Sequence, residues 1–400
     1  MSVRLLENGW PKGRGLVLGD HQVCTRCVMD TTATEISFDD EGVCSFCRRF
    51  DDSVLPVLEY MQTDQCKMEL RSIVDAIRSS GSAKRYDCVL GLSGGVDSAY
   101  LACVAVDLGL RPLAVHVDTG WNSATTVDNI ERLSKRLGLA LHVVTIDWEE
   151  MRDMQLAFYK AAVRNCEIPY DHAFFASLYR VAASWRIPYI LSGGNLATES
   201  ILPASWGHNA LDLRYIKSVY ARYGMQGTLR RYPTLSFWQQ YFYYPMIKGI
   251  RQVRLLNYLN YNKARAIEEI KQRCGWEDYG GKHHEAVSTR FFQCYYLPTK
   301  FSIDKRKAHL SSLILSGQMS RDEAIKELMK PPCSEAQIND DKRYMAKELG
   351  VSMDEWDDIL RRPARDDLEF ASSNMLHSAK ARVVRLLGLR RWSMKAPSGR

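Results

Sequence analysis

Four cysteines near the N-terminus have the spacing of a metal-binding module. Cys24 and Cys27 form one Cys-x-x-Cys pair, and Cys44 and Cys47 form a second pair after sixteen intervening residues. Two such pairs bring four thiolates into a tetrahedron, which Zn²⁺ fills with four protein ligands and no open position. The spacing predicts a zinc ribbon that folds the segment and does not catalyse a reaction. An iron–sulfur cluster has the same ligand number and, like a set of reduced buried thiols, stays an alternative.

A run of glycine and serine follows an apolar stretch at residues 86–92. Glycines let the backbone approach an anion closely, and successive N–H groups at the start of a helix can hold phosphate. The hydroxyls of Ser93 and Ser98 add donors, and Asp97 can hold Mg²⁺ or cap the helix. No Lys-Ser or Lys-Thr pair follows the glycines, so the Walker pattern is absent. We expect Ser93, Asp97 and Ser98 to be catalytic. The residues expected to bind phosphate are Gly91, Leu92, Ser93, Gly94, Gly95, Asp97 and Ser98.

The run Ser93-Gly94-Gly95-Val96-Asp97-Ser98 resembles the pyrophosphate loop (PP-loop) of the N-type ATP pyrophosphatases, in the adenine nucleotide α-hydrolase superfamily. Those enzymes cleave ATP to AMP and pyrophosphate while they adenylylate a substrate oxygen. Two further segments, residues 116–120 and 192–195, each end a predicted strand and fit this resemblance, although each alone suits an ordinary turn. The resemblance implies nucleotide contacts at Val117 and Asp118, where adenine would be recognised, and at Gly193, Gly194 and Asn195.

Four segments spread over nearly the whole chain resemble a narrower family, the N-acetyl sugar amidotransferases. They are Cys27-Val28-Met29-Asp30-Thr31-Thr32, Gly194-Asn195-Leu196-Ala197-Thr198-Glu199-Ser200, Gly280-Gly281-Lys282-His283-His284-Glu285 and the run from Leu297 to Leu310. These enzymes of O-antigen and nonulosonic acid pathways convert a sugar acetamido group to an acetamidino group. The resemblance implies an enzyme that uses ATP and Mg²⁺ with a structural Zn²⁺, and it does not indicate which sugar or nucleotide carrier is used.

Basic side chains concentrate in the C-terminal part of the chain, where donors suit phosphate or carboxylate groups. The residues expected to bind the sugar substrate are Glu199, Lys282, His283, His284, Arg290, Lys300, Lys305 and Arg306. A solvated basic face is the alternative interpretation. The His-His-Glu triplet lacks the i, i+4 histidine spacing of a zincin helix, which argues against a metal site there.

The reaction implied by the resemblance consumes ammonia. An amide oxygen is a poor leaving group, so adenylylation converts it to a group that departs as AMP when ammonia attacks. The chain has no Gly-x-Cys-x-Gly segment, the nucleophile motif of an amidotransferase glutaminase. The resemblance therefore implies a separate glutaminase and a cyclase-like companion, similar to the two subunits of imidazole glycerol phosphate synthase. We expect a heteromeric complex without nucleic acid and without membrane insertion.

Two other functions are open at this point. A tRNA-thiolating enzyme also combines zinc knuckles with this loop, but that chemistry commonly uses a cysteine pair in the ATPase domain. Residues 86–215 contain only the isolated Cys88, Cys103 and Cys166. A non-catalytic zinc-ribbon interaction protein is the second alternative, and the intact Ser93 and Asp97 argue against it.

Alternating strands and helices must position the central motifs. Apolar strands at residues 86–92, 113–117, 141–146 and 189–191 alternate with helical patterns, among them 98–108 and 126–137. This order predicts an α/β fold, an open doubly wound parallel sheet of the PP-loop type. The expected divisions are a lead-in at 1–20, the ribbon at 21–50, a helical linker at 51–85, the PP-loop domain at 86–215, a mostly helical substrate and partner region at 216–379, and a basic tail at 380–400.

Composition limits the class of protein. The 400 residues are 46% hydrophobic and 25% charged, which is typical of a globular chain, and the net charge of +7 favours anionic partners. No apolar run is long enough to cross a bilayer and no signal sequence is present, so we expect a soluble, cytoplasmic protein. Seven of the eleven cysteines are scattered outside the ribbon and predict no disulfide framework.

Overall fold

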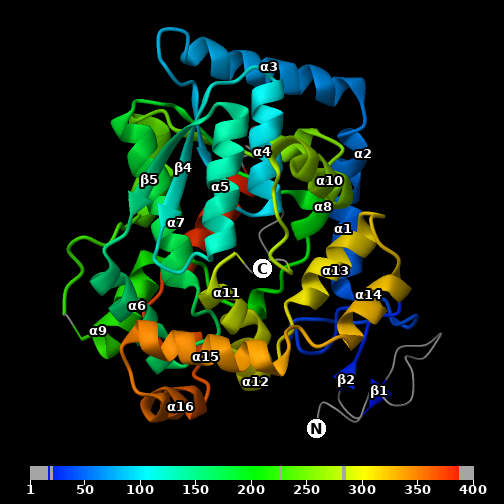
Figure 1. Cartoon of the computed structure of the whole chain (residues 1–400). Helices are drawn as coiled ribbons and strands as arrows, with labels where there is room; N and C mark the ends of the chain where they lie inside the picture. The colour runs from blue at the N-terminus through cyan, green and yellow to red at the C-terminus, as the bar shows by residue number, and fades with distance from the viewer. Residues whose placement is uncertain (1–16, 19–20, 226, 282–284, 387–400) are drawn as a thin grey trace.

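A parallel five-stranded sheet forms the centre of the protein in the computed structural model, which describes residues 17–18, 21–225, 227–281 and 285–386 (Figure 1). The strands are β3 (Cys88–Gly91), β4 (Pro112–Asp118), β5 (Ala140–Thr145), β6 (Tyr189–Leu191) and β7 (Arg251–Val253). Their order across the sheet is β5-β4-β3-β6-β7, and every neighbouring pair is parallel. The predicted doubly wound α/β fold is confirmed.

Helices cover both faces of this sheet, which explains why its central strand is apolar throughout. All four residues of β3 are buried. On one face α4 (Val96–Asp107) and α5 (Ala124–Leu137) pack side by side, with α10 (Lys263–Cys274) across both (Figure 1). On the other face α7 (Ile168–Ser184) contacts β3, β4 and β6, and α6 (Trp148–Ala161) packs beside it. Helix α5 buries Ile130 and Leu133 and ends at Gly138, whose positive φ of 66° suits glycine.

The fifth strand comes from beyond residue 215, where the alternation of strand and helix was expected to end. Strand β7 pairs with β6 in the register Tyr189↔Arg251 and Leu191↔Val253. Its three residues, Arg-Gln-Val, include no apolar run, so the local pattern gives no strand signal. Part of the C-terminal half of the sequence therefore completes the central sheet.

The N-terminal segment forms a small module beside the sheet. Strands β1 (Val17–Leu18) and β2 (His21–Gln22) pair antiparallel, and bridges Val23↔Asp30 and Phe38↔Cys44 fold the ribbon. Helices α1 (Ser45–Ser53), α2 (Leu55–Tyr60) and α3 (Asp64–Ser80) connect it to β3. The lead-in at 1–16 and 19–20 and the tail at 387–400 lie outside the described residues.

The remaining chain is mostly helical, as predicted. Its helices are α8 (Leu196–Glu199), η1 (Ala204–Trp206), α9 (Leu213–Tyr223), η2 (Gln239–Ile247), η3 (Leu255–Tyr258), α11 (Val287–Phe291), η4 (Phe292–Tyr296), α12 (Leu297–Phe301), α13 (Arg306–Leu315), α14 (Arg321–Met329), α15 (Glu335–Leu349), α16 (Met353–Arg361), η5 (Asp367–Glu369) and α17 (Asn374–Leu386). Ser320 and Glu323 form a capping box at the start of α14.

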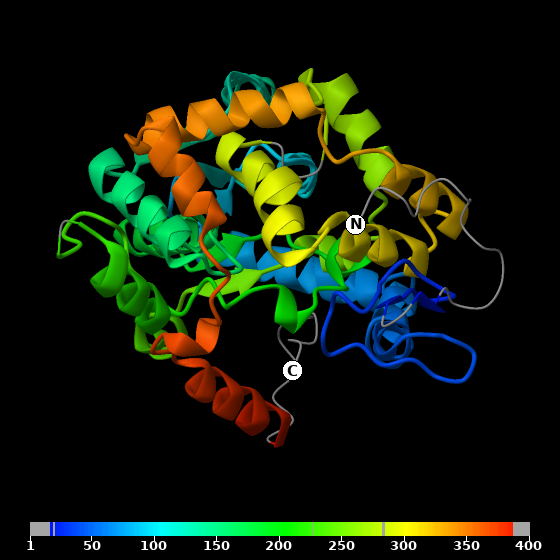
Figure 2. The same ribbon diagram turned by 90° about the horizontal axis from the view of Figure 1, so that it is seen from below.

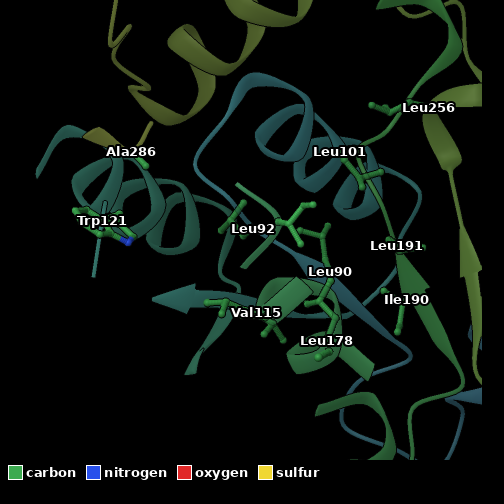
Figure 3. Packing of buried hydrophobic residues seen from close by; sticks show 14 of the residues in the cluster. Leu90, Leu92, Leu101, Val115, Trp121, Leu178, Ile190, Leu191, Leu256 and Ala286 are labelled. Carbon is green, nitrogen blue, oxygen red and sulfur yellow. The ribbon is translucent and has the colours of Figure 1, made fainter. Parts of the chain in front are cut away.

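One hydrophobic core runs from the ribbon through the sheet to α16. Figure 3 shows its centre, where Leu90, Val115 and Ile190 from three strands pack with Leu178 of α7. Trp121, Trp206 and Trp356 are among its largest fully buried side chains. Within the described part of the chain, no helix is long and apolar enough to cross a membrane.

Candidate nucleotide site and metal centre

A cavity of about 470 Å³ lies at the carboxyl ends of β3 and β6. The chain leaves β3 toward β4 and β5 and then returns to β6 on the other side of β3, so these two strands flank the point where strand order reverses. Open α/β sheets bind ligands at this switch point. The described lining includes Gly91, Ser93, Gly95, Val96, Asp97, Ser98, Gly193, Gly194 and Glu199, all from the predicted motifs.

The phosphate loop is held by its own serines. Ser98 Oγ accepts from Ser93 N at 3.3 Å and donates to Gly95 O at 3.0 Å, and the two serine hydroxyls are 3.0 Å apart. Helix α4 begins at Val96, so the N–H groups of its first turn and its dipole face the cavity. Gly94 has φ of 84°, and a side chain on Gly193 would come within 3.1 Å of the α4 backbone. The glycines are therefore required by both conformation and close approach.

Asp97 is oriented by two partners that follow different strands. Its Oδ1 accepts from Tyr261 OH and from Asn195 Nδ2, the latter at 3.4 Å. Burial, followed by the charge of Asp97, raises the pKa of Tyr261, so this phenol stays a donor at neutral pH. Asn195 was expected near the nucleotide, whereas Tyr261 was not singled out because no sequence motif marks it.

Trp276, Tyr279 and Glu285, from the C-terminal half of the chain, lie at the phosphate loop. Trp276 Nε1 donates to Gly94 O at 3.0 Å, and Tyr279 OH donates to Glu285 Oε1 at 3.1 Å. The Glu285 carboxylate lies so close to the loop that a Cβ on Gly95 would be 2.5 Å from its Oε1. The backbone of Glu285 is anchored beyond β4, because Ser123 N donates to its carbonyl at 3.0 Å. Glu285 is the last residue of the segment 280–285, which resembles the N-acetyl sugar amidotransferases. This resemblance could have marked it, but Glu285 was not predicted as a site residue.

The charge of the cavity suits a metal-bound phosphate. Among its described lining residues, Asp97, Glu199, Asp278 and Glu285 carry carboxylates and Lys263 carries an ammonium group. Carboxylates beside a phosphate loop would repel an uncompensated polyphosphate, whereas Mg²⁺ is usually held by one or two carboxylates together with substrate phosphates. Asp97 and Glu285 flank the loop and are the residues that fit this ion.

The ammonium group of Lys263 lies at the cavity, although the sequence did not predict Lys263 as a site residue. Its Nζ lies 3.0 Å from His309 Nε2, and His309 Nδ1 lies 3.1 Å from Thr198 O. A carbonyl can only accept, so His309 Nδ1 carries the hydrogen and Nε2 accepts from the Lys263 ammonium. This connection between α10, α13 and α8 positions Lys263 at the cavity wall beside Glu199.

The apolar wall of the cavity comes from Phe174, Phe175 and Leu178 of α7, with Leu191 and Ile267. Val117 and Asp118, expected to contact adenine, are not among the described lining residues. Val117 is buried in the sheet, and Asp118 Oδ1 accepts from Gly120 N at 2.9 Å and Asn122 Nδ2 at 3.3 Å. The side chains of α7 provide the surface suited to a base or the apolar face of a sugar.

The predicted C-terminal donors do not converge on the cavity. Glu199 lines it, while Lys282, His283 and His284 lie outside the described residues. Arg290 forms a two-pronged ion pair with Asp341 at 2.8 and 2.7 Å, and Arg306 pairs with Asp304 and donates to Lys330 O at 2.8 Å. Lys300 donates to Arg362 O. These three side chains join helices of the C-terminal region, because guanidinium and ammonium groups at half-buried positions find local acceptors.

Lys305 lies near a pair of buried acids, with its ammonium 5.5 Å from the centre of the Phe292 ring. Burial raises the pKa of Glu167 to about 7, against the lowering effect of a hydrogen bond from Thr289. Burial also raises the pKa of Asp171 to about 6, against the lowering effect of Lys305. Among the described residues, Glu167 Oε1 has no hydrogen-bond partner.

The four ribbon cysteines meet the geometry of a metal centre. Their ligand atoms lie within 4.8 Å of one another, and all four residues are buried. Three sulfur–sulfur distances are 3.7, 3.7 and 3.6 Å, for Cys24–Cys47, Cys27–Cys44 and Cys44–Cys47. A tetrahedron with metal–sulfur distances of about 2.3 Å has sulfurs about 3.8 Å apart. The donor set therefore fits Zn²⁺.

One disulfide forms among the cysteines outside the ribbon, where no disulfide framework was expected. Cys294 and Cys333 are bonded across 39 residues, with Cα atoms 5.9 Å apart. The two cysteines are distant in sequence and share no motif, so their spacing alone could not predict this pair.

Comparisons with known proteins agree with this architecture. Residues 67–226 match the NAD synthase family, and residues 285–383 match the C-terminal domain of the WbpG-like lipopolysaccharide (LPS) biosynthesis proteins. The chain therefore joins an NAD synthase-like segment, which contains the phosphate loop, to a WbpG-like segment that begins at Glu285.

Individual relatives match shorter segments. A glutamine-dependent NAD(+) synthetase of Aquifex aeolicus is 33% identical over 105 residues, 26% of this chain and 17% of the relative. A tRNA(Ile)-lysidine synthase of Chlamydia pneumoniae is 37% identical over 75 residues, 18% of this chain and 23% of the relative. The chain thus spans about a fifth of each of these relatives.

Solved structures of similar proteins include an NH3-dependent NAD synthetase from Campylobacter jejuni, at 16% identity, and an NMN synthetase from Francisella tularensis, at 15%. Each alignment covers 72% of this chain and 97% of the other, with a TM-score of 0.29.

Proposed function

We propose that this protein is an ATP-dependent amidotransferase that converts the acetamido group of an N-acetylated, nucleotide-linked sugar to an acetamidino group, with release of AMP and pyrophosphate. The product would serve the biosynthesis of a surface polysaccharide such as O-antigen. The observation that carries the proposal is Glu285, because this first residue of the WbpG-like match lies against Gly95 of the phosphate loop. The family-specific domain therefore contributes to the nucleotide site itself.

The phosphate loop would hold the β- and γ-phosphates, which leave together as pyrophosphate. Backbone N–H groups at the N-terminus of α4, which begins at Val96, would be fixed donors to this negative charge. Asp97 and Glu285 would hold Mg²⁺, which neutralises charge on the phosphates when bound. Tyr261 and Asn195 keep the Asp97 carboxylate oriented, so little reorganisation is needed on binding.

Two displacements complete the proposed reaction. The acetamido oxygen attacks the α-phosphorus and the bond from that phosphorus to the pyrophosphate oxygen breaks. Ammonia then adds to the activated carbon, loses a proton, and the carbon–oxygen bond breaks with AMP as the leaving group. Lys263 and Glu199 line the same cavity and would orient the sugar. Ion pairs and hydrogen bonds from fixed side chains would hold the reacting atoms in line.

Ammonia would be supplied by separate subunits, a glutaminase and a cyclase-like companion that together resemble imidazole glycerol phosphate synthase. The sequence supports this because it lacks the Gly-x-Cys-x-Gly nucleophile segment of a glutaminase. On this proposal the purified chain works with concentrated ammonium at alkaline pH and fails with glutamine.

The proposal is tested by incubating the purified chain with ATP, Mg²⁺ and ammonium and a panel of nucleotide-linked acetamido sugars. The expected result is AMP formation that depends on one sugar class, with the loss of about one mass unit that replacement of oxygen by NH produces. The Asp97→Asn variant, which keeps a side chain of the same shape, serves as the inactive control. Sugar-independent AMP formation, ADP in place of AMP, or AMP formation driven by tRNA would contradict the proposal.

A further inference from the structure

An exposed apolar stripe runs along η2. Its members, with their exposed fractions, are Trp238 (65%), Phe242 (52%), Tyr243 (38%), Met246 (69%) and Ile247 (64%). A π-helix bonds residue i to i+5, so residues four or five apart share one face. Trp238, then Phe242 with Tyr243, then Met246 with Ile247 follow this spacing. The opposite face is packed, because Tyr244 is buried and stacks on Tyr179 of α7 at 4.9 Å.

Helix α17 extends the apolar stripe. His377 of α17 lies 5.0 Å from the Phe237 ring and 5.6 Å from the Tyr241 ring, measured between ring centres. Met375 and Leu376, directly before His377, are themselves exposed. Figure 2 shows α17, in red, projecting from the rest of the molecule. Single exposed apolar residues are ordinary, but a contiguous group of this kind marks an interaction surface.

Exposed basic side chains lie near the stripe. Lys248 and Arg251 are exposed at the end of η2 and the start of β7, and Arg180 is exposed on α7. Within the described part of the chain, none of these three forms an ion pair with an acidic residue. A partner of this surface must therefore be anionic as well as apolar.

The stripe and the cavity lie toward opposite ends of the strands. The stripe precedes β7, whose first residue, Arg251, donates its N–H to Pro188 O just before β6. The stripe thus lies toward the amino ends of β6 and β7, whereas the cavity opens at the carboxyl ends of β3 and β6. A subunit that delivers ammonia to the cavity would contact the opposite end of these strands.

We infer that the stripe, together with the basic residues Arg180, Lys248 and Arg251, binds the surface of an anionic lipid bilayer. Trp, Tyr and Phe side chains favour the level of the lipid headgroups, where one end of the ring is apolar and the other is hydrated. Helices that lie in this interface combine an apolar face with lysine and arginine, and cations near the surface strengthen binding to acidic lipids. Binding is peripheral and leaves the fold unchanged, because the stripe is already exposed. This inference does not depend on the proposed reaction.

Vesicle flotation with the full chain tests the inference. We expect binding to phosphatidylcholine vesicles that contain about 30% phosphatidylglycerol, weak binding to phosphatidylcholine alone, and release as salt rises toward about 1 M. The variant Trp238→Ala/Phe242→Ala/Met246→Ala should bind at least about tenfold more weakly. The variant Lys248→Glu/Arg251→Glu should lose about tenfold or more on anionic vesicles only.

A matched control removes three exposed methionines elsewhere, Met68, Met329 and Met353, by substitution with Ala. This control should bind vesicles as the unmodified protein does, and thermal melts should show that all variants are folded. A blue shift of Trp fluorescence on binding, absent in Trp238→Phe, would place the stripe in the lipid. No binding, equal binding to neutral vesicles, equal loss in the methionine control, or a dimer in solution that the stripe variant dissociates would overturn the inference.

Discussion

At the scale of single residues, the site depends on side chains that the loop motif does not contain. Glu285 and Tyr261 come from the C-terminal half of the chain, yet one lies against Gly95 and the other donates to Asp97. The sequence predicted the loop residues because glycine, serine and aspartate at a strand-to-helix turn have few other uses. It could not predict Tyr261, since a tyrosine in an aromatic-rich segment carries no local signal.

Replacing Glu285 with Gln should lower sugar-dependent AMP formation at least about a hundredfold, because the variant keeps the shape and removes the charge beside the phosphates. Raising the Mg²⁺ concentration should recover part of the loss. The matched control is Glu277→Gln, which alters an exposed carboxylate of the same segment that pairs with Arg132. If Glu285→Gln retained full activity, its carboxylate would only support the fold.

Glu167 makes the stability of the folded protein depend on pH. Its pKa is raised from 4.5 to about 7, mainly by burial, so the folded protein favours the neutral acid. Stability is therefore full below the unfolded pKa and falls as pH rises through about 7, by about 3 kcal/mol for this group alone. Thermal melts between pH 5 and pH 8 should show a falling midpoint, with a shallower fall in Glu167→Gln. An identical slope in both proteins would contradict this assignment.

At the scale of elements, the strands and helices of residues 86–191 follow from their apolar patterns, because local periodicity reports which face is buried. Strand β7 could not be predicted, since its three residues are a strand only by pairing with β6. The basic residues of the C-terminal region show the same limit. Arg290 and Asp341 are 51 residues apart, and no local spacing reveals that α11 and α15 meet there.

Arg290→Ala should destabilise the protein and leave the KM for the sugar nearly unchanged. The Asp341 carboxylate is buried, so removal of its partner leaves an unpaired charge at a cost of about 3 kcal/mol. Thermal melts of Arg290→Ala, Asp341→Ala and the double variant form a cycle in which the double variant is less destabilised than the sum. An unchanged melting temperature together with a raised KM for the sugar would contradict this and indicate that Arg290 binds the substrate.

At the scale of the whole molecule, the ribbon and the C-terminal helices are joined. Arg321 of α14 donates to Cys24 O and Cys27 O at 2.9 and 3.0 Å, and Lys307 of α13 pairs with the buried Asp30. Burial raises the pKa of Asp30, but hydrogen bonds from His21 and Lys307 outweigh this and lower it overall. The sequence predicted the cysteine tetrahedron but not this contact, because the partners lie almost 300 residues apart.

Loss of the ribbon metal should therefore destabilise the C-terminal region as well as the ribbon. We expect one Zn²⁺ per chain by elemental analysis, and Cys44→Ser should lose it and melt at a lower temperature. Hydrogen exchange in α13 and α14 should rise in this variant. Cys66→Ser, which changes a buried cysteine outside the tetrahedron, should keep the metal. Full metal content in Cys44→Ser would refute the assignment of its ligands.

The central claim is that the substrate acetamido oxygen attacks the α-phosphorus of ATP. A sugar carrying ¹⁸O in its acetamido group, turned over with ammonium and analysed by mass spectrometry, follows that atom directly. The proposed function predicts that the label appears in the phosphoryl group of AMP and that the amidino product is unlabelled. Label that stays in the sugar, or AMP that carries only solvent oxygen, would contradict it.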